Sequence, residues 1–327
     1  MTRLGYQIPN FTYPGVSAAG LFEAIARQAR EADASGFDTV LVMDHFYQLP
    51  MLGAPEAFML ECYSLLSALA RETTKVRLSS LVTGNTYRNP AVLAKTVTTL
   101  DIVSGGRAQL GIGAGWFQLE HDAFGIEFGT FTDRFEKLEE ALQIIIPMLR
   151  GEPANLSGKH YNAVNAINSP PAVSRIPVMI GGGGERKTLR MVAQYADESN
   201  IIAEARDLSR KLDALAEHCE RLGRARSEIT VSWQRSACIA PTMEQAKRDL
   251  AEGFAARGVN LDSLSDEQRS AMTDRFILGD PDTVGERLAA DLARGVDGFT
   301  INAPINGHIP ERVALLGQTA AKVVGLA

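Results

Sequence analysis

The sequence predicts an α/β fold, a single (β/α)8 TIM barrel over residues 1–327 with loop insertions. Short apolar runs, too brief for soluble helices, alternate with longer segments whose apolar residues recur every three or four positions. Eight such strand–helix pairs follow one another with the strand first, which favours a closed barrel over an open doubly wound sheet. We therefore expect one domain, with excursions near residues 151–175 and 259–280.

The expected strands share a buried apolar character and are bounded by turn residues. In chain order they are Leu4–Pro9, Val40–Met43, Lys75–Thr83, Arg107–Gly113, Ile176–Ile180, Ser199–Ile202, Ile229–Ile239 and Gly298–Ala303. Helices are expected between them, and several begin at residues typical of helix N-termini. Their expected starts lie near Leu21, Leu60, Asn89-Pro90, Thr130, Glu185, Leu208, Thr242, Asp280-Pro281 and Pro310.

Composition excludes several classes of function. The net charge is −6 and no basic block occurs, which argues against binding to nucleic acid or a membrane surface. Cys62, Cys219 and Cys238 are odd in number and widely separated, so we expect buried thiols in a reducing compartment. The sequence shows neither a signal-peptide pattern nor an apolar run of about 18 residues, so a soluble, cytoplasmic protein is expected.

A polar pair ends the second expected strand. The apolar run Val40–Met43 stops abruptly at Asp44 and His45. Ligands bind at the carboxyl ends of strands in barrels, and histidine can move a proton near neutral pH. We expect His45 to face a cofactor; the alternative is a histidine that only hydrogen-bonds locally. No metal is expected, because Ile8–Phe11 stands where barrel hydrolases present a His-x-His pair.

Two glycine-rich turns are further candidate sites. Gly181–Gly184 follows an expected strand and precedes a helix, so its backbone amides suit a phosphate; the alternative is a tight turn needed for packing. Gly111–Gly115 fails as a dinucleotide fingerprint, because its third glycine comes one residue early. These glycines would instead let a flat ring approach the backbone, with Trp116 and Phe117 as walls.

Taken together, these stretches resemble the luciferase-like monooxygenase superfamily, in particular its deazaflavin (coenzyme F-420) dependent branch. The matching segments occur in the family's order over most of the chain. They are Met43–Phe46, Leu78–Pro90, Leu110–Phe124, Thr132–Phe135 and Val178–Gly184. The family fold is a (β/α)8 barrel, in agreement with the strand count.

The resemblance implies roles for individual residues. His45 matches the family histidine beside the reactive ring, and Asp44 matches its neighbour. Ser80-Leu81 matches a position where the family often has a cis peptide bond that supports the ring, and Thr83 matches a ring contact. The other implied cofactor contacts are Gly113, Ala114, Gly181, Gly182, Gly183 and Gly184.

Trp116 marks a departure from part of this branch. The sugar-phosphate dehydrogenases of the branch carry a catalytic glutamate after the glycines of the fourth strand, where this sequence has Trp116. We therefore expect a substrate other than a sugar phosphate, held in an apolar or aromatic-lined pocket that includes Trp116 and Asn10.

The expected activity is hydride transfer between coenzyme F-420 and an unidentified organic substrate at the C-terminal mouth of the barrel, with His45 moving the accompanying proton. One alternative is an FMN-dependent two-component monooxygenase that receives reduced flavin from a separate reductase. Another is a non-catalytic protein that binds a flavin or deazaflavin. The resemblance also implies a homodimer.

Overall fold

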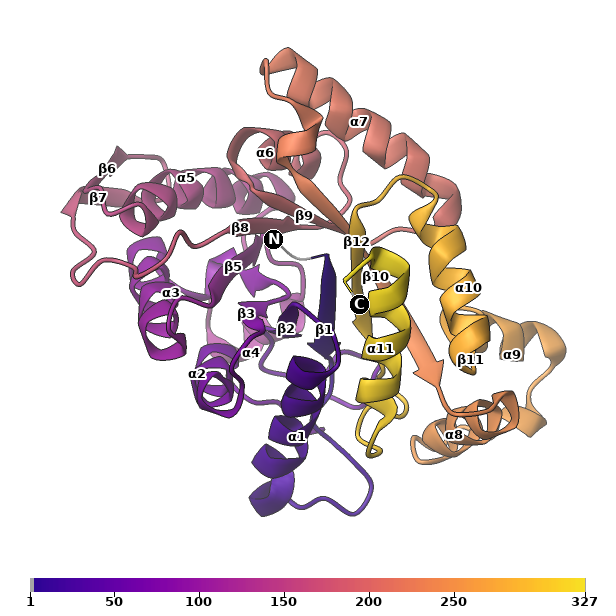
Figure 1. Ribbon diagram of the computed structural model, residues 1–327. Coiled ribbons are helices and arrows are strands. Elements are labelled where there is room, and N and C mark those ends of the chain that lie inside the picture. The colour runs from indigo at the N-terminus through magenta and orange to yellow at the C-terminus, as the bar shows by residue number, and fades with distance from the viewer. Residues whose placement is uncertain (1–2, 327) are drawn as a thin grey trace. The chain divides into compact units, whose positions relative to one another are not determined.

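The structure, a computed structural model, describes residues 3–326 (Figure 1). Its alternating strands and helices have the (β/α)8 barrel architecture that the sequence predicts. The chain divides into two compact units. The first consists of residues 42–46 and 60–230, and the second of residues 3–41, 47–59 and 231–326. No helix within residues 3–326 is long and apolar enough to cross a membrane.

The first unit contains four strands that pair in parallel. Their order is β3 (Arg77–Ser80), β5 (Ala108–Gly113), β8 (Val178–Gly181) and β9 (Glu198–Ile201), and the short β4 (Thr83–Gly84) also pairs with β5. Most of their residues are buried, as expected for strands covered on both faces. The end of β2 (Thr39–Val42) lies beside this sheet, because Leu81 N–H donates to Val42 O at 2.8 Å. The residues that follow β2, β5 and β8 therefore lie near one another, at the carboxyl ends of these strands.

The helices of this unit begin where the sequence supplies caps. They are α2 (Cys62–Glu72), α3 (Pro90–Ser104), α4 (Gln118–Phe124), α5 (Phe131–Leu149), α6 (Thr188–Tyr195) and α7 (Leu208–Arg221). The Asn89 side chain accepts from the first amides of α3, and Pro90 is its first residue, as predicted. Thr130 and Asp133 form the predicted capping box of α5.

The excursion at residues 151–175 has its own structure. The strands β6 (Ala154–Ser157) and β7 (Asn162–Ala166) form an antiparallel hairpin. This hairpin packs against α5 on the outside of the first unit (Figure 1). Its turn carries His160 and Tyr161, which the hairpin brings close to α5.

The second unit has the strand order β11 (Phe276–Gly279), β10 (Thr230–Ile239), β12 (Gly298–Asn302) and β1 (Leu4–Ile8), all parallel. Its helices are α1 (Leu21–Ala34), α8 (Met243–Ala255), α9 (Asp266–Thr273), α10 (Pro281–Leu292) and α11 (Arg312–Val324). Short 3-10 turns in the two units are η1 (Ala18–Gly20), η2 (Asn85–Tyr87), η3 (Ala205–Asp207), η4 (Arg226–Glu228) and η5 (Leu261–Ser263). The three cysteines are free and buried, as predicted.

Some expected boundaries were wrong. The third strand stops at Ser80 and resumes as β4, and the helix expected from about Glu185 begins at Thr188. The polar stretch of residues 259–280 was not expected to hold regular structure, yet it contains α9 and β11. A four-residue strand such as β11 is too short for periodicity to reveal. Tertiary packing stabilises it, because Phe276 joins a buried cluster with Cys238 and Phe254.

Candidate active site

A histidine paired with a buried carboxylate lies at the end of β2. His45 Nδ1 is 2.9 Å from Glu120 Oε2 on α4, and the Glu120 side chain is wholly buried. The second oxygen of Glu120 accepts from the backbone N–H of Phe46. Tyr87 in η2 donates its hydroxyl to Oε2 at 2.5 Å. Two donors thus converge on the Glu120 carboxylate, and His45 Nδ1 lies within hydrogen-bond distance of the same group.

Asp44 is held by arginine. Both oxygens of its carboxylate accept from Arg88, at 2.6 and 3.0 Å, and Arg88 also reaches Glu61 at 2.6 Å. Burial raises the pKa of Asp44, and Arg88 opposes that shift. The structure places Asp44 fully buried with both oxygens bound to Arg88, which fixes the backbone that carries His45. The expected contact of Asp44 with a cofactor stays a prediction.

The turn after β3 is built on buried hydroxyls. Ser80 donates to Gly111 O at 2.7 Å and lies 2.7 Å from Thr83 Oγ1, which also contacts the Tyr63 hydroxyl at 2.6 Å. The cis peptide bond was expected at Ser80-Leu81, and that expectation was wrong by one residue. The bond joins Leu81 and Val82. Ring contacts by Ser80, Leu81 and Thr83 stay predictions.

The position of the Val82 side chain explains why glycine stands at residues 113 and 181. A Cβ at Gly113 would lie 2.9 Å from Val82 Cγ2, and a Cβ at Gly181 would lie 2.6 Å from Val82 Cγ1. Larger residues at these positions would displace Val82, which is only partly buried. The glycines at the ends of β5 and β8 thus let the Leu81–Val82 turn sit between them. Cofactor contacts by Gly113, Ala114 and Gly181 remain predictions.

The glycine loop after β8 leaves backbone amides available. Gly182 has a φ of +123° and donates its N–H to Asn200 O at 2.9 Å. Within residues 3–326, the N–H groups of Gly183 and Gly184 have no hydrogen-bond acceptor. Lys211 Nζ donates to Gly183 O at 2.6 Å and places a positive charge beside the loop. Two such amides next to a cation can hold a phosphate.

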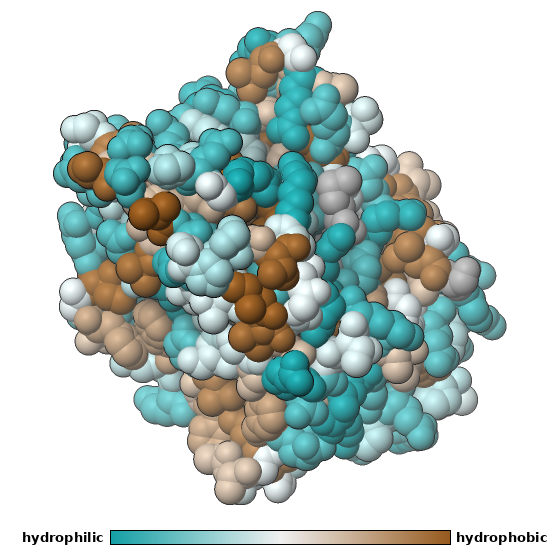
Figure 2. Space-filling view, turned by 60° about the vertical axis from the view of Figure 1, so that its left-hand side comes forward, coloured by the Kyte–Doolittle hydropathy of each residue, from teal (hydrophilic) through white to brown (hydrophobic). Residues whose placement is uncertain are grey.

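Aromatic side chains surround His45. The rings of Trp116 and Phe117 stand edge-on to His45, with centroids 5.8 and 5.9 Å away, and stack on each other at 5.2 Å. Trp116 is 55% exposed and Phe117 is buried. On the face drawn in Figure 2, apolar side chains form several patches separated by hydrophilic surface. Trp116 is thus brought to His45 and remains open to a ligand.

Asn10, the second residue expected in the substrate pocket, belongs to the other unit. It follows β1, is buried, and donates its amide to Thr12 O at 3.5 Å. Its role stays a prediction.

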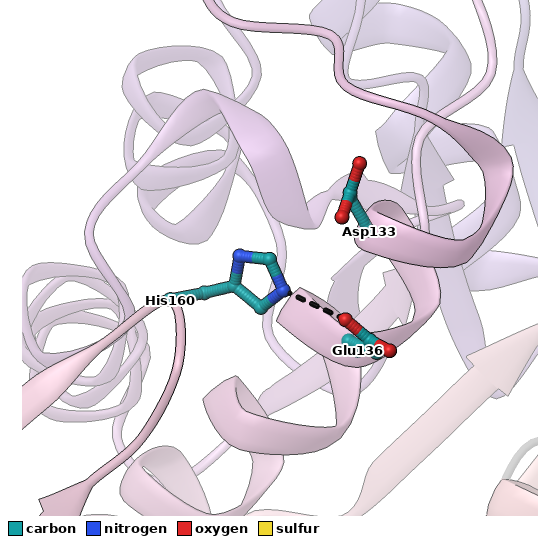
Figure 3. Close-up of side chains that lie close together, drawn as sticks. All are labelled: Asp133, Glu136 and His160. Atoms are coloured by element: carbon teal, nitrogen blue, oxygen red, sulfur yellow. Dashed lines mark hydrogen bonds and ion pairs between the residues drawn. The ribbon is translucent and has the colours of Figure 1, made fainter.

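The fold also brings together Asp133, Glu136 and His160, a grouping that their sequence spacing does not reveal. Figure 3 shows His160 pointing from the hairpin turn toward the two carboxylates on α5, with its Nε2 3.0 Å from Glu136 Oε2. Lys159 Nζ lies 2.8 Å from Glu136 and 3.5 Å from Asp133. The lysine already supplies the positive charge that these carboxylates need, so the cluster is a surface ion-pair network.

Three central residues were missed by sequence reasoning: Glu120, Tyr87 and Arg88. Tyr87 and Arg88 lie inside the matched segment Leu78–Pro90, and Glu120 lies inside Leu110–Phe124. An acidic residue among the apolar and aromatic residues of Leu110–Phe124 was the available signal for Glu120. Its partner could not be identified, because 75 residues separate it from His45.

This chain is similar in sequence to a known relative. The F420-dependent glucose-6-phosphate dehydrogenase of Segniliparus rotundus is 32% identical to this chain over 311 residues, which cover 85% of this chain and 86% of the relative.

Solved structures share the fold at lower identity. An F420-dependent secondary alcohol dehydrogenase in complex with an F420-acetone adduct is 19% identical, with a TM-score of 0.78 over 99% of both chains. A type II Baeyer–Villiger monooxygenase of Pseudomonas putida in complex with FMN is 20% identical, with a TM-score of 0.75 over 98% of both chains. The profile of the luciferase-like monooxygenase family matches residues 2–298. The chain therefore belongs to the luciferase-like monooxygenase family.

Proposed function

We propose that this protein is an oxidoreductase dependent on coenzyme F420 that transfers a hydride between this deazaflavin and an organic substrate at the carboxyl ends of the strands. The observation that carries the proposal is the hydrogen bond between the partly exposed His45 and the wholly buried Glu120. The relative from Segniliparus rotundus, whose name states dependence on F420, supports the choice of cofactor.

The residues after β8 fit a phosphate-bearing cofactor. The unpaired amides of Gly183 and Gly184 and the ammonium group of Lys211 would hold its phosphate, and the Leu81–Val82 turn would support a flat ring. A Cβ at Gly183 would lie 3.0 Å from Ile202 O, so a side chain there would press against that carbonyl group. When bound, the deazaflavin supplies two-electron hydride chemistry, and the protein supplies position and a proton.

His45 moves that proton. With Nδ1–H donated to the Glu120 carboxylate, Nε2 is the nitrogen that accepts or delivers the proton. Glu120 stabilises the imidazolium ion that forms, because its negative charge lies 2.9 Å away in a wholly buried position. The arrangement follows the logic of a histidine oriented by a buried carboxylate.

The substrate surface beside His45 is aromatic. Trp116 presents 55% of its surface next to the His45 ring, and Phe117 stacks behind it. An apolar or aromatic alcohol, ketone or enone would bury surface against Trp116, whereas a sugar phosphate would leave its hydroxyl groups unpaired there. We therefore propose a substrate that is not a sugar phosphate.

The test replaces His45 with Ala. Turnover of a substrate that the wild-type protein accepts from a panel of such compounds should fall by about 10²- to 10⁴-fold. Affinity for F420, followed by fluorescence titration, should change little, because the phosphate loop is intact. His160→Ala is the matched control, since His160 also pairs with a glutamate at 3.0 Å but outside this site. Unchanged turnover in His45→Ala would refute the proposed role.

A second candidate is an FMN-dependent monooxygenase, favoured by the structural likeness to the Baeyer–Villiger enzyme crystallised with FMN. The two functions separate in one experiment. Tighter binding of F420 than of FMN, without oxygen consumption by the reduced complex, supports the first. Tighter binding of FMN with oxygen consumption supports the second.

A further inference from the structure

We propose that Tyr87 is a positioning residue that sets the protonation of His45 through Glu120. The inference deepens the proposed function, since it concerns the residue assigned to move the proton. Sequence reasoning gave Tyr87 no role.

One carboxylate oxygen joins the two residues. Glu120 Oε2 lies 2.9 Å from His45 Nδ1 and accepts from the Tyr87 hydroxyl at 2.5 Å. The two donors compete for the same negative charge. The phenol therefore takes part of the stabilisation that Glu120 would otherwise give to a protonated His45.

The Tyr87 ring is held in a fitted position. Its centroid lies 4.8 Å from that of Phe46 and 5.0 Å from that of His121. A Cβ at Gly84 would lie 2.5 Å from Tyr87 Cε2, so only glycine at this position allows the ring to close onto Glu120. His121 itself is fixed, because its two ring nitrogens contact Thr86 Oγ1 at 2.7 Å and Phe117 O at 2.9 Å.

Tyr87 remains a donor over the working pH range. Burial and its hydrogen bond to Glu120 raise the pKa of Tyr87 far above the ordinary value for a phenol. The hydroxyl therefore keeps its proton near neutral pH, so its hydrogen bond to Glu120 persists.

The other charged groups around Tyr87 and Glu120 are bound to partners of their own. Asp44 and Arg88 act on Tyr87 through space, but they are bound to each other, and Arg88 also binds Glu61. Tyr87 also lines a polar cleft of about 280 Å³. Its titratable and charged lining groups are Arg88, Glu127, Lys137, His160 and Tyr161. In this cleft Lys137 is bound to Glu127 at 2.8 Å, and His160 is bound to Glu136. The carboxylate that His45 contacts is Glu120.

The effect of removing the phenol has a definite sign. In Tyr87→Phe, Glu120 loses a donor and its charge acts more fully on His45. The protonated form of His45 therefore gains stability. The pH profile of turnover should move to higher pH in either direction of hydride transfer, because the same histidine carries the proton.

The experiment follows the histidine resonances by NMR in the protein without cofactor. The chain has five histidines, so the His45 signal can be assigned by its absence in His45→Gln. In Tyr87→Phe the pH at which the His45 signal is halfway through its change should be higher than in the wild-type protein. Tyr161→Phe is the matched control: Tyr161 lines the same cleft, but its hydroxyl lies by Asn85. Circular dichroism of each variant checks folding.

The outcomes are distinct. A higher midpoint of the His45 signal in Tyr87→Phe alone, which disappears when Glu120→Gln is added, supports the inference. An unchanged midpoint, or an equal change in Tyr161→Phe, overturns it. Because this measurement needs neither cofactor nor substrate, its failure is separate from failure of the proposed function, which the turnover of His45→Ala decides. A matching upward shift in the pH profile of turnover would link the two.

Discussion

Two histidines in the first unit each contact a glutamate at about the same distance, yet their surroundings differ. His45 lies 2.9 Å from Glu120, and His160 lies 3.0 Å from Glu136. The Glu120 side chain is wholly buried, whereas that of Glu136 is 41% exposed and shares its charge with Lys159. Glu136 is open to water and shares its charge with a lysine, whereas the Glu120 carboxylate is shielded from solvent and accepts from Phe46 N–H and the Tyr87 hydroxyl.

The difference shows that distance alone does not make a proton-transfer pair. An exposed ion pair is screened and contributes little, whereas a buried carboxylate with fixed donors acts strongly on whatever it contacts. The exposed pair anchors the β6–β7 hairpin to α5, because Glu140 on the same helix also accepts the backbone amides of Lys159, His160 and Tyr161.

The largest expected contrast is in turnover. Glu120→Gln should lower turnover by about 10²-fold or more, because His45 loses the charge that stabilises its protonated form. Glu136→Gln, the same change in the exposed pair, should leave turnover within about twofold of the wild-type value. Steady-state kinetics on the two variants measure the contrast. Equal losses in both would remove the distinction between the pairs.

The second contrast compares how much Arg88, which binds a buried carboxylate, and Lys159, which binds an exposed one, contribute to the free energy of unfolding. Arg88→Met leaves the buried Asp44 carboxylate without its bidentate partner, which should lower the free energy of unfolding by about 3 kcal/mol. Lys159→Met removes an exposed cation and should leave the free energy of unfolding unchanged within error. Urea unfolding followed by circular dichroism tests both. A loss in Lys159→Met as large as in Arg88→Met would contradict the assignment.

The smallest expected effect concerns pH at the exposed cluster. The hydrogen bonds from the Thr130 side chain and backbone lower the pKa of Asp133 to about 2, below its unfolded value of about 3.9. Because the folded pKa is depressed, this contribution to stability is present above about pH 4 and is lost as pH falls toward about 2. In Thr130→Ala the pKa of Asp133, measured by NMR titration, should rise toward its ordinary value.

Thr132→Ala is the control for this titration, since Thr132 is an exposed neighbour in the same turn of α5. An Asp133 pKa that stays low in Thr130→Ala would mean that the capping box is not its cause. The turnover of both threonine variants should match that of the wild-type protein.

Periodicity and capping residues were sufficient to predict much of the fold. Asn89-Pro90 and Thr130 with Asp133 begin helices as expected, since these signals act within one helical turn. The strand β11 and the helix α4 were not predicted, because both are short and depend on distant partners. Polar residues at the end of β2 drew attention to His45, and the glycine-rich stretch after the fourth strand drew attention to Trp116; the structure brings these two rings together.

The sequence by itself determined the alternation of strands and helices, the glycine turns at the strand ends and the presence of a histidine after β2. Only the tertiary structure decided what that histidine contacts. Glu120 is 75 residues from His45 and 33 from Tyr87, so no local pattern could pair them. Parallel strands place their carboxyl ends at one edge while long crossovers separate them in sequence. Burial at that edge, which only the complete packing creates, is what gives the Glu120 carboxylate its effect on His45.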